Sequence, residues 1–254
     1  MQASLACGRG PGQSGAMRAA LLALALPTFA APAGAQGPCA TDAIVVFDGS
    51  ASMAEIGLDI VDAPRIVDAR TAMARVMPEV EHYRRIGLVT YGPGPEGSCE
   101  GIRVRFPPID AAAARMAAEL DALDPNGLTP LAAAVERAAD VLDYRARPAI
   151  VVLVTDGNET CGGRPCALGD RLAAEAADLT VHVIGFKVTR DFFAWDNPEQ
   201  QGYDGDTVAK CLSDRTGGQF VSTQTVDELV DALRGTLGCL VVGRGPDTAD
   251  VGRL

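Results

Sequence analysis

The chain has 254 residues, of which 48% are hydrophobic and 22% charged, and its formal net charge is −11. This length and composition fit one globular domain with a single core. An acidic chain that lacks a basic cluster repels phosphate backbones, so we do not expect nucleic-acid binding.

Residues 1–35 have the layout of a secretory signal. A positive start at Met17-Arg18 precedes an apolar run over residues 19–29 and small residues up to Ala35. This order predicts cleavage after Ala35, with Met17 as the true initiator. The apolar run is too short to span a bilayer. We therefore expect an exported protein, periplasmic or secreted. Its net charge would fall to −13, because the removed segment holds two arginines and no acid.

Six cysteines remain in the mature chain, and an even number in an exported protein predicts disulfides. A thiolate zinc site is the alternative, but the chain has only two histidines and no CxxC pair to support one. The six residues are Cys39, Cys99, Cys161, Cys166, Cys211 and Cys239.

Short apolar, β-branched runs alternate with helical patterns along the mature chain. Continuous runs such as residues 150–154 are typical of strands buried on both faces of a parallel sheet. Between these runs, apolar residues recur at helical spacing, as in residues 131–142, and Thr225 could cap the last helix. The expected strands are Ala43–Phe47, Ile86–Tyr91, Ile102–Phe106, Ala149–Thr155, Thr180–Phe186 and Gln219–Ser222.

The second and third expected strands are joined by residues 92–101, which are rich in Gly and Pro, rather than by a helix. Such a connection favours an antiparallel edge strand. The pattern predicts an α/β fold with a doubly wound, mostly parallel six-stranded sheet, one antiparallel edge strand, and helices on both faces. The domain would cover residues 36–239, and residues 240–254 would form a loose tail.

Small oxygen-bearing residues stand where this fold would place a ligand site. Asp48, Ser50 and Ser52 follow the first expected strand, Asp156 follows the fourth, and Thr129 precedes the long helix between them. In doubly wound sheets, ligands bind beyond the carboxyl ends of the strands. Such oxygens could together hold Mg²⁺, which prefers about six oxygen ligands. The alternative is that the three hydroxyls cap helices.

Asp-x-Ser-x-Ser, a helix-opening Thr and a later Asp-Gly together resemble the metal-ion-dependent adhesion site of von Willebrand factor type A (VWA) and integrin I domains. The resemblance covers residues 41–237, and the site is complete in Asp48, Ser50, Ser52, Thr129 and Asp156. Residues 155–161 also look like those of exported bacterial VWA proteins.

The resemblance implies a ligand set. The two serines would ligate Mg²⁺ directly, the threonine directly or through water, and the aspartates largely through water; Mn²⁺ or Ca²⁺ could replace Mg²⁺. It also implies a function, which is the capture of an Asp or Glu carboxylate of a partner protein at the open coordination position.

Residues 190–205 follow the fifth expected strand, so they should lie on the same face of the molecule as the metal site. Loops of this length are commonly functional, and aromatic side chains anchor interfaces. The aromatic residues could instead pack down as a small satellite core. The candidates for partner contact are Phe192, Phe193, Trp195 and Tyr203.

Cys39 and Cys239 flank the domain and are expected to pair. In the strand order usual for the resembling family, Cys99 and Cys211 are about three strand spacings apart, roughly 15 Å, which is too far for a disulfide. We therefore favour Cys99–Cys161 together with Cys166–Cys211. The pairing Cys99–Cys166 with Cys161–Cys211 stays open, as does a free, buried Cys211.

Catalysis is not expected. A Mg²⁺-dependent phosphatase of the haloacid-dehalogenase type needs a second Asp as general acid, and Ser50 stands at that position. His182 lies within an expected strand, and no GxxxxGK[ST] loop for nucleotides occurs. The remaining alternative is a non-catalytic scaffold with a vestigial metal site.

Overall fold

The computed structural model describes residues 38–56, 63–95, 97–188, 199 and 207–239, all within the compact unit that spans residues 36–254. The expected signal segment 1–35 and tail 240–254 lie outside the described residues. Within the described ranges, no helix has the length and apolar character needed to cross a membrane.

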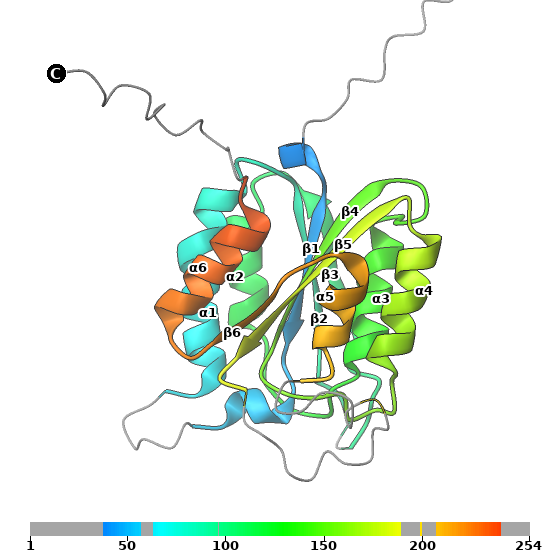
Figure 1. Ribbon diagram of the computed structural model, residues 1–254. Coiled ribbons are helices and arrows are strands. Elements are labelled where there is room, and N and C mark those ends of the chain that lie inside the picture. Colours follow the sequence, from blue (N-terminus) through cyan, green and yellow to red (C-terminus); the bar gives the residue numbers. More distant parts are fainter. Residues whose placement is uncertain (1–37, 57–62, 96, 189–198, 200–206, 240–254) are drawn as a thin grey trace, which may run out of the picture. The chain divides into compact units, whose positions relative to one another are not determined.

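A six-stranded sheet in the order β3-β2-β1-β4-β5-β6 forms the centre of the domain (Figure 1). Neighbouring strands pair in parallel except β2 and β3, which pair antiparallel and place β3 at one edge. This confirms the expected fold class. The strands are β1 (Ala43–Asp48), β2 (Ile86–Tyr91), β3 (Arg103–Ile109), β4 (Pro148–Thr155), β5 (Asp178–Phe186) and β6 (Phe220–Thr223).

The third strand extends furthest beyond its expected end, because β3 runs past Phe106 through Pro107 and Pro108 to Ile109. Proline cannot donate a hydrogen bond to a neighbouring strand, so a central strand would have ended there. An edge strand tolerates proline, since its outer side needs no partner.

Helices cover both faces of the sheet. On one face lie α1 (Arg65–Val80), α2 (Ala113–Asp121) and α6 (Val226–Leu237); on the other lie α3 (Leu131–Val141), α4 (Pro165–Glu175) and α5 (Lys210–Thr216) (Figure 1). Two short 3₁₀ helices complete the described chain, η1 (Pro38–Ala40) and η2 (Ala51–Ala54).

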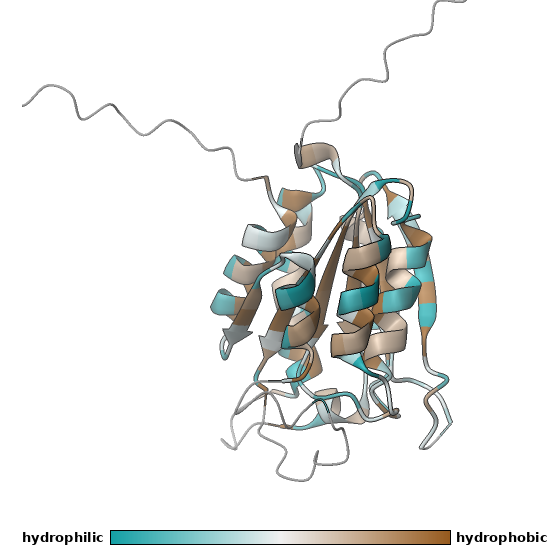
Figure 2. Cartoon of the chain, turned by 45° about the vertical axis from the view of Figure 1, so that its right-hand side comes forward, coloured by the Kyte–Doolittle hydropathy of each residue, from teal (hydrophilic) through white to brown (hydrophobic). Residues whose placement is uncertain are grey.

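Strand β1 is buried on both faces, as its unbroken apolar run predicts. Val45 and Phe47 pack into the core beneath α1 and α6, whereas Ile44 and Val46 pack into the core beneath α3. The apolar strands between more polar outer helix surfaces are visible in Figure 2. Two cores therefore hold β1 rigidly, so the residues that come after it start from a fixed position.

Three disulfides staple this framework. Cys39 pairs with Cys239 across the domain ends, Cys99 with Cys161, and Cys166 with Cys211 between α4 and α5, with Cα–Cα distances of 5.1, 5.8 and 4.9 Å. These are the pairs that the sequence favoured, and Cys211 is not free. Because all six cysteines are bonded, none of them is available as a thiolate ligand for zinc.

Candidate metal centre

Four of the five expected site residues lie together at the carboxyl ends of β1 and β4. Asp48 ends β1, Ser50 directly precedes η2, Ser52 lies in its first turn, and Asp156 directly follows β4. Strands β1 and β4 are parallel neighbours, so the residues after one strand lie beside the residues after the other. This is the position at which doubly wound folds bind ligands.

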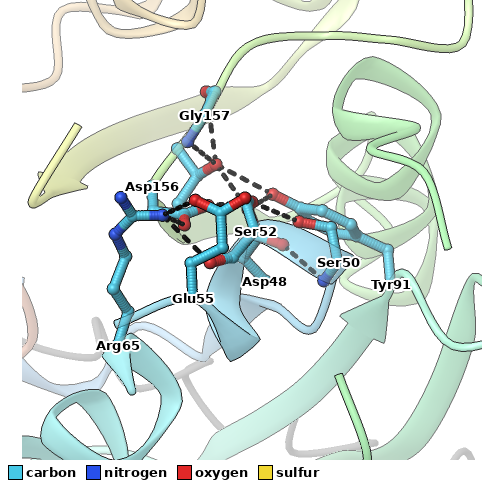
Figure 3. A network of polar contacts seen from close by, with 9 residues as sticks. Asp48, Ser50, Ser52, Glu55, Arg65, Tyr91, Asp156 and Gly157 are labelled. Atoms are coloured by element: carbon cyan, nitrogen blue, oxygen red, sulfur yellow. Dashed lines mark hydrogen bonds and ion pairs between the residues drawn. The ribbon is translucent and has the colours of Figure 1, made fainter. Parts of the chain in front are cut away.

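The hydroxyl groups of this turn face one another and the second carboxylate (Figure 3). The Oγ atoms of Ser50 and Ser52 are 3.1 Å apart, and Ser52 Oγ donates a hydrogen bond of 2.7 Å to Asp156 Oδ1. Ser50 is the residue before η2, yet its side chain makes no capping hydrogen bond. The capping alternative therefore does not hold for Ser50.

Asp48 is fully buried and held by three donors. Its Oδ1 accepts from Ser50 N at 2.8 Å, while its Oδ2 accepts from Tyr91 Oη and Thr155 Oγ1, each at 2.7 Å. Burial, together with the charge of Asp48, raises the pKa of Tyr91 well above its usual value, so the phenol stays protonated and remains a donor. The carboxylate is thus fixed in one orientation.

Arg65, the first residue of α1, reaches into the same cluster. One of its nitrogens, Nη1, donates to Asp156 Oδ2 at 3.0 Å, to the carbonyl of Ser52 at 2.9 Å and to Glu55 Oε2 at 3.1 Å. This residue was not among those expected from the sequence. A signal did exist, because a basic side chain is unfavourable in the first turn of a helix and needs an acidic partner there.

The two buried carboxylates repel each other. Burial, and secondly the negative charge of Asp48, raise the pKa of Asp156 to about 7, whereas Ser52 and Arg65 pull it down. The rise outweighs the help from both partners. The ionised form of Asp156 is therefore less favourable in the metal-free cluster than in water.

Thr129 follows a turn that lies beside the cluster. The turn before it is bonded to the loop after β1, from Asn126 N to Gly49 O at 3.0 Å and from Ala51 N to Gly127 O at 3.2 Å. Gly127 has a positive φ of 76°, and a Cβ there would collide with the carbonyl of Gly92, so only glycine permits this approach.

Thr129 itself is 5% exposed, and its backbone N–H donates to Thr160 Oγ1 at 2.8 Å. Its hydroxyl stands outside the hydrogen-bonded network that joins Asp48, Ser50, Ser52 and Asp156. The residue before α3 is Pro130, so Thr129 does not cap that helix either.

Glu159 is a further buried carboxylate, and it too was not among the residues expected from the sequence. Its Oε2 accepts from Ala132 N, in the first turn of α3, and its Oε1 accepts from Cys161 N, both at 2.8 Å. A carboxylate at the start of a helix is stabilised by the helix dipole. Glu159 therefore ties the loop after Asp156 to α3, which explains its burial without a ligand.

The sequence also predicted partner-binding residues on this face of the molecule. The aromatic candidates Phe192, Phe193, Trp195 and Tyr203 lie outside the described residues. Within the described part of the chain, no three His, Cys, Asp or Glu side chains cluster as a metal-binding group. A cation held by this cluster would therefore depend on the hydroxyl oxygens as well as on the two aspartates.

Residues 43–159 match the family model of the von Willebrand factor type A domain. The matched VWA segment runs from β1 to the loop after β4 and contains all five expected site residues. The rest of the sheet, β5 and β6, lies beyond the matched segment.

Two curated relatives from Bacillus subtilis (strain 168) align with the chain. YwmD is 33% identical over 116 residues, which are 44% of this chain and 46% of YwmD. YwmC is 28% identical over 181 residues, which are 67% of this chain and 77% of YwmC. The aligned region therefore spans less than half of the first relative and about three quarters of the second.

Solved structures share the VWA-like fold at low sequence identity. The pilus adhesin SpaC from Lactobacillus rhamnosus GG has a TM-score of 0.58 at 12% identity, covering 78% of this chain and 30% of SpaC. Proximal thread matrix protein 1 from the mussel byssus, solved with a zinc-occupied MIDAS motif, has a TM-score of 0.50 at 17% identity, covering 78% of this chain and 46% of that chain.

Proposed function

We propose that this protein is an exported module that binds a partner protein through a divalent cation. The proposed cation is Mg²⁺. Ser50 and Ser52 would hold the ion directly, with Thr129, Asp48 and Asp156 contributing directly or through water. The ion, when bound, supplies a Lewis-acidic position for a carboxylate oxygen of the partner.

The spacing of the oxygens carries this proposal. Mg²⁺ binds oxygen at about 2.0–2.1 Å in an octahedron, so neighbouring ligand oxygens lie about 2.9 Å apart. Ser50 Oγ and Ser52 Oγ are 3.1 Å apart, and Ser52 Oγ and Asp156 Oδ1 are 2.7 Å apart. These three oxygens therefore fit neighbouring positions of such a shell. All are hard oxygen donors, as Mg²⁺ requires.

Charge then favours an acidic partner group. Serine and threonine hydroxyls are neutral, and both oxygens of Asp48 already accept hydrogen bonds from protein donors. The ion's charge is thus poorly quenched, and an incoming carboxylate gains strongly from it. The chain itself has a net charge of −11, so without the ion an acidic partner would be repelled. Binding should therefore depend steeply on the cation.

Export and the binding role draw support from the relatives. The similar structures include a pilus adhesin and a byssus matrix protein, and three disulfides suit an oxidising compartment.

We also propose that the segment with Phe193 and Trp195 supplies the specific contacts to the partner. Replacing both with Ser should weaken partner binding and leave the thermal midpoint nearly unchanged; a collapsed midpoint would instead mean that they form a satellite core.

The test begins with the metal alone. Isothermal titration calorimetry with Mg²⁺ should give a binding isotherm that chelator abolishes and that Thr129→Ala weakens strongly. Silence in the wild type would favour the scaffold with a vestigial site. Partner capture should then require Mg²⁺ and fail in Thr129→Ala. The matched control is Thr225→Ala, because the Thr225 hydroxyl accepts a hydrogen bond from Glu228 N in α6 and not from the cluster. This variant should capture the partner normally. Equal capture by both variants would reject the assigned role of Thr129.

A further inference from the structure

Arg65 contacts the cluster at two points that matter for a cation. Its Nη1 donates both to Oδ2 of Asp156, the carboxylate oxygen that Ser52 does not contact, and to the backbone carbonyl of Ser52 (Figure 3). The side chains of Arg65 and Asp156 are 5% and 0% exposed, so this ion pair lies away from solvent. The third contact, to Glu55, differs because that carboxylate is 65% exposed.

The arrangement divides the two oxygens of Asp156 between two neighbours. Oδ1 accepts from Ser52 and faces the hydroxyl cluster, whereas Oδ2 is held by the guanidinium. A guanidinium and a divalent cation attract the same carboxylate and repel each other. Where both are buried, salt and water screen this repulsion little.

Hydrogen bonding alone does not explain why the Arg65 side chain is buried at this place. The Nε of Arg65 is buried and has no hydrogen-bond partner in the described part of the chain. By contrast Arg70, on the same helix, uses Nε and Nη2 on the carbonyls of Leu120 and Leu123. The geometry around Arg65 thus favours contact with charge over a full set of hydrogen bonds.

We propose that Arg65 is a positioning residue that acts as a resident cation of this centre. It compensates Asp156 when no metal is bound and competes with the divalent cation when one is. Arg65 therefore stabilises the metal-free form, weakens metal binding, and keeps part of the Asp156 charge away from the metal. The metal, less quenched as a result, is left more attractive to a partner's carboxylate. This inference rests on the proposed function, because it concerns the same site.

The decisive variant is Arg65→Gln, which removes the charge and keeps an N–H donor for Asp156. Mg²⁺ titrated by calorimetry should bind at least tenfold more tightly to Arg65→Gln than to the wild type. In chelator, the thermal midpoint of this variant should lie below that of the wild type, yet Mg²⁺ should raise it by more. A merely structural arginine would lower both midpoints in parallel and would not tighten metal binding.

The matched control is Arg75→Gln. Arg75 lies ten residues further along α1, about 15 Å away along the helix axis, and forms an exposed ion pair with Asp227. This variant removes the same charge at a distance beyond the screening length of about 8 Å. Its Mg²⁺ affinity should match that of the wild type.

The outcomes separate this inference from the proposed function. If the wild type binds Mg²⁺ and folded Arg65→Gln binds it equally or less tightly, the role of Arg65 is overturned and the metal site stands. If only Arg65→Gln binds Mg²⁺, the resident-cation role is supported and the proposed function of the natural chain fails. If neither binds, both fail.

A second pair of variants serves if Arg65→Gln does not fold. Glu55→Gln alters an exposed side chain and leaves the whole guanidinium charge to Asp156 and the centre. Mg²⁺ affinity should then fall at least threefold. Glu79→Gln, which breaks the exposed pair between α1 and Arg234, should leave it unchanged. Equal affinities in these two variants would overturn the proposal.

Discussion

Two segments that each come after a parallel strand use similar polar residues in opposite ways. After β6, Thr225 Oγ1 accepts from Glu228 N at 3.2 Å, and Glu228 Oε2 accepts from the N–H groups of Gln224 and Thr225. After β1, Ser50 Oγ and Ser52 Oγ instead face each other and Asp156.

The difference separates structural polar groups from groups available to a ligand. At the start of α6, side-chain oxygens satisfy backbone N–H groups that the helix leaves unpaired, which is the capping box. In the loop after β1, the serine hydroxyls cap nothing, and they converge with two carboxylates that repel each other. Arg65 offsets part of the resulting loss of stability, and a bound cation would offset more, so the arrangement points to binding.

The distinction between the two segments would fail if Mg²⁺ affinity simply followed the stability of the domain. The variant with the largest expected loss of stability tests this. Cys39–Cys239 closes a loop of 200 residues. Replacing both cysteines with Ala should destabilise the domain by about 5 kcal/mol in the chain-entropy model. Chemical denaturation measures this loss. Mg²⁺ affinity, measured where the variant is still folded, should stay within twofold of the wild type; a parallel loss would mean that the centre reports only on global stability.

The next largest effect should come from Asp48→Asn, which removes one of the two buried charges. Mg²⁺ affinity is expected to fall at least a hundredfold, about 3 kcal/mol, as measured by calorimetry. Because Asp48 accepts from three donors, the amide nitrogen must face one of them, and some stability is lost as well. Asn leaves more of these bonds intact than Ala does. An affinity loss smaller than tenfold would place Asp48 outside the metal's surroundings.

Ser52→Ala should have a smaller effect on the same property. The substitution removes one neutral oxygen ligand, and water can take its place, so we expect Mg²⁺ to bind about tenfold more weakly, or about 1.4 kcal/mol. The hydroxyl caps no helix but donates to the buried carboxylate of Asp156, so denaturation should show a stability loss of about 1 kcal/mol. A large stability loss with unchanged metal affinity would return Ser52 to a structural role.

The sequence was sufficient wherever the chemistry is local. Unbroken β-branched runs predict strands such as β4, and a residue directly after such a strand, like Asp156, must lie at the carboxyl edge of the sheet. The spacing of Ser50 and Ser52 also predicts that both side chains point out of one turn. The distance of 3.1 Å between their Oγ atoms agrees with this prediction. These features depend on neighbours in sequence or on a fixed strand direction.

The sequence was insufficient where position depends on packing between distant elements. Arg65 meets Asp156, 91 residues later in the sequence, because α1 packs beside η2 and Ser52 of η2 is hydrogen-bonded to Asp156. Tyr91 donates to Asp48 because β2 lies next to β1 in matching register. A basic residue at the start of a helix indicates that an acidic partner exists but not which one, and periodicity gave no reason to select Tyr91.

Thr225→Ala should give the smallest of these effects and the sharpest contrast with Ser52→Ala. Both variants delete one hydroxyl near the start of a helix, but only Thr225 accepts from a backbone N–H in a capping box. Its loss should cost about 1 kcal/mol of stability and leave Mg²⁺ affinity unchanged. Denaturation and calorimetry on the two variants should thus differ in metal affinity, which falls in Ser52→Ala and stays unchanged in Thr225→Ala. If both variants lost stability alone, the hydroxyls after β1 would be structural, and the distinction between the two segments would disappear.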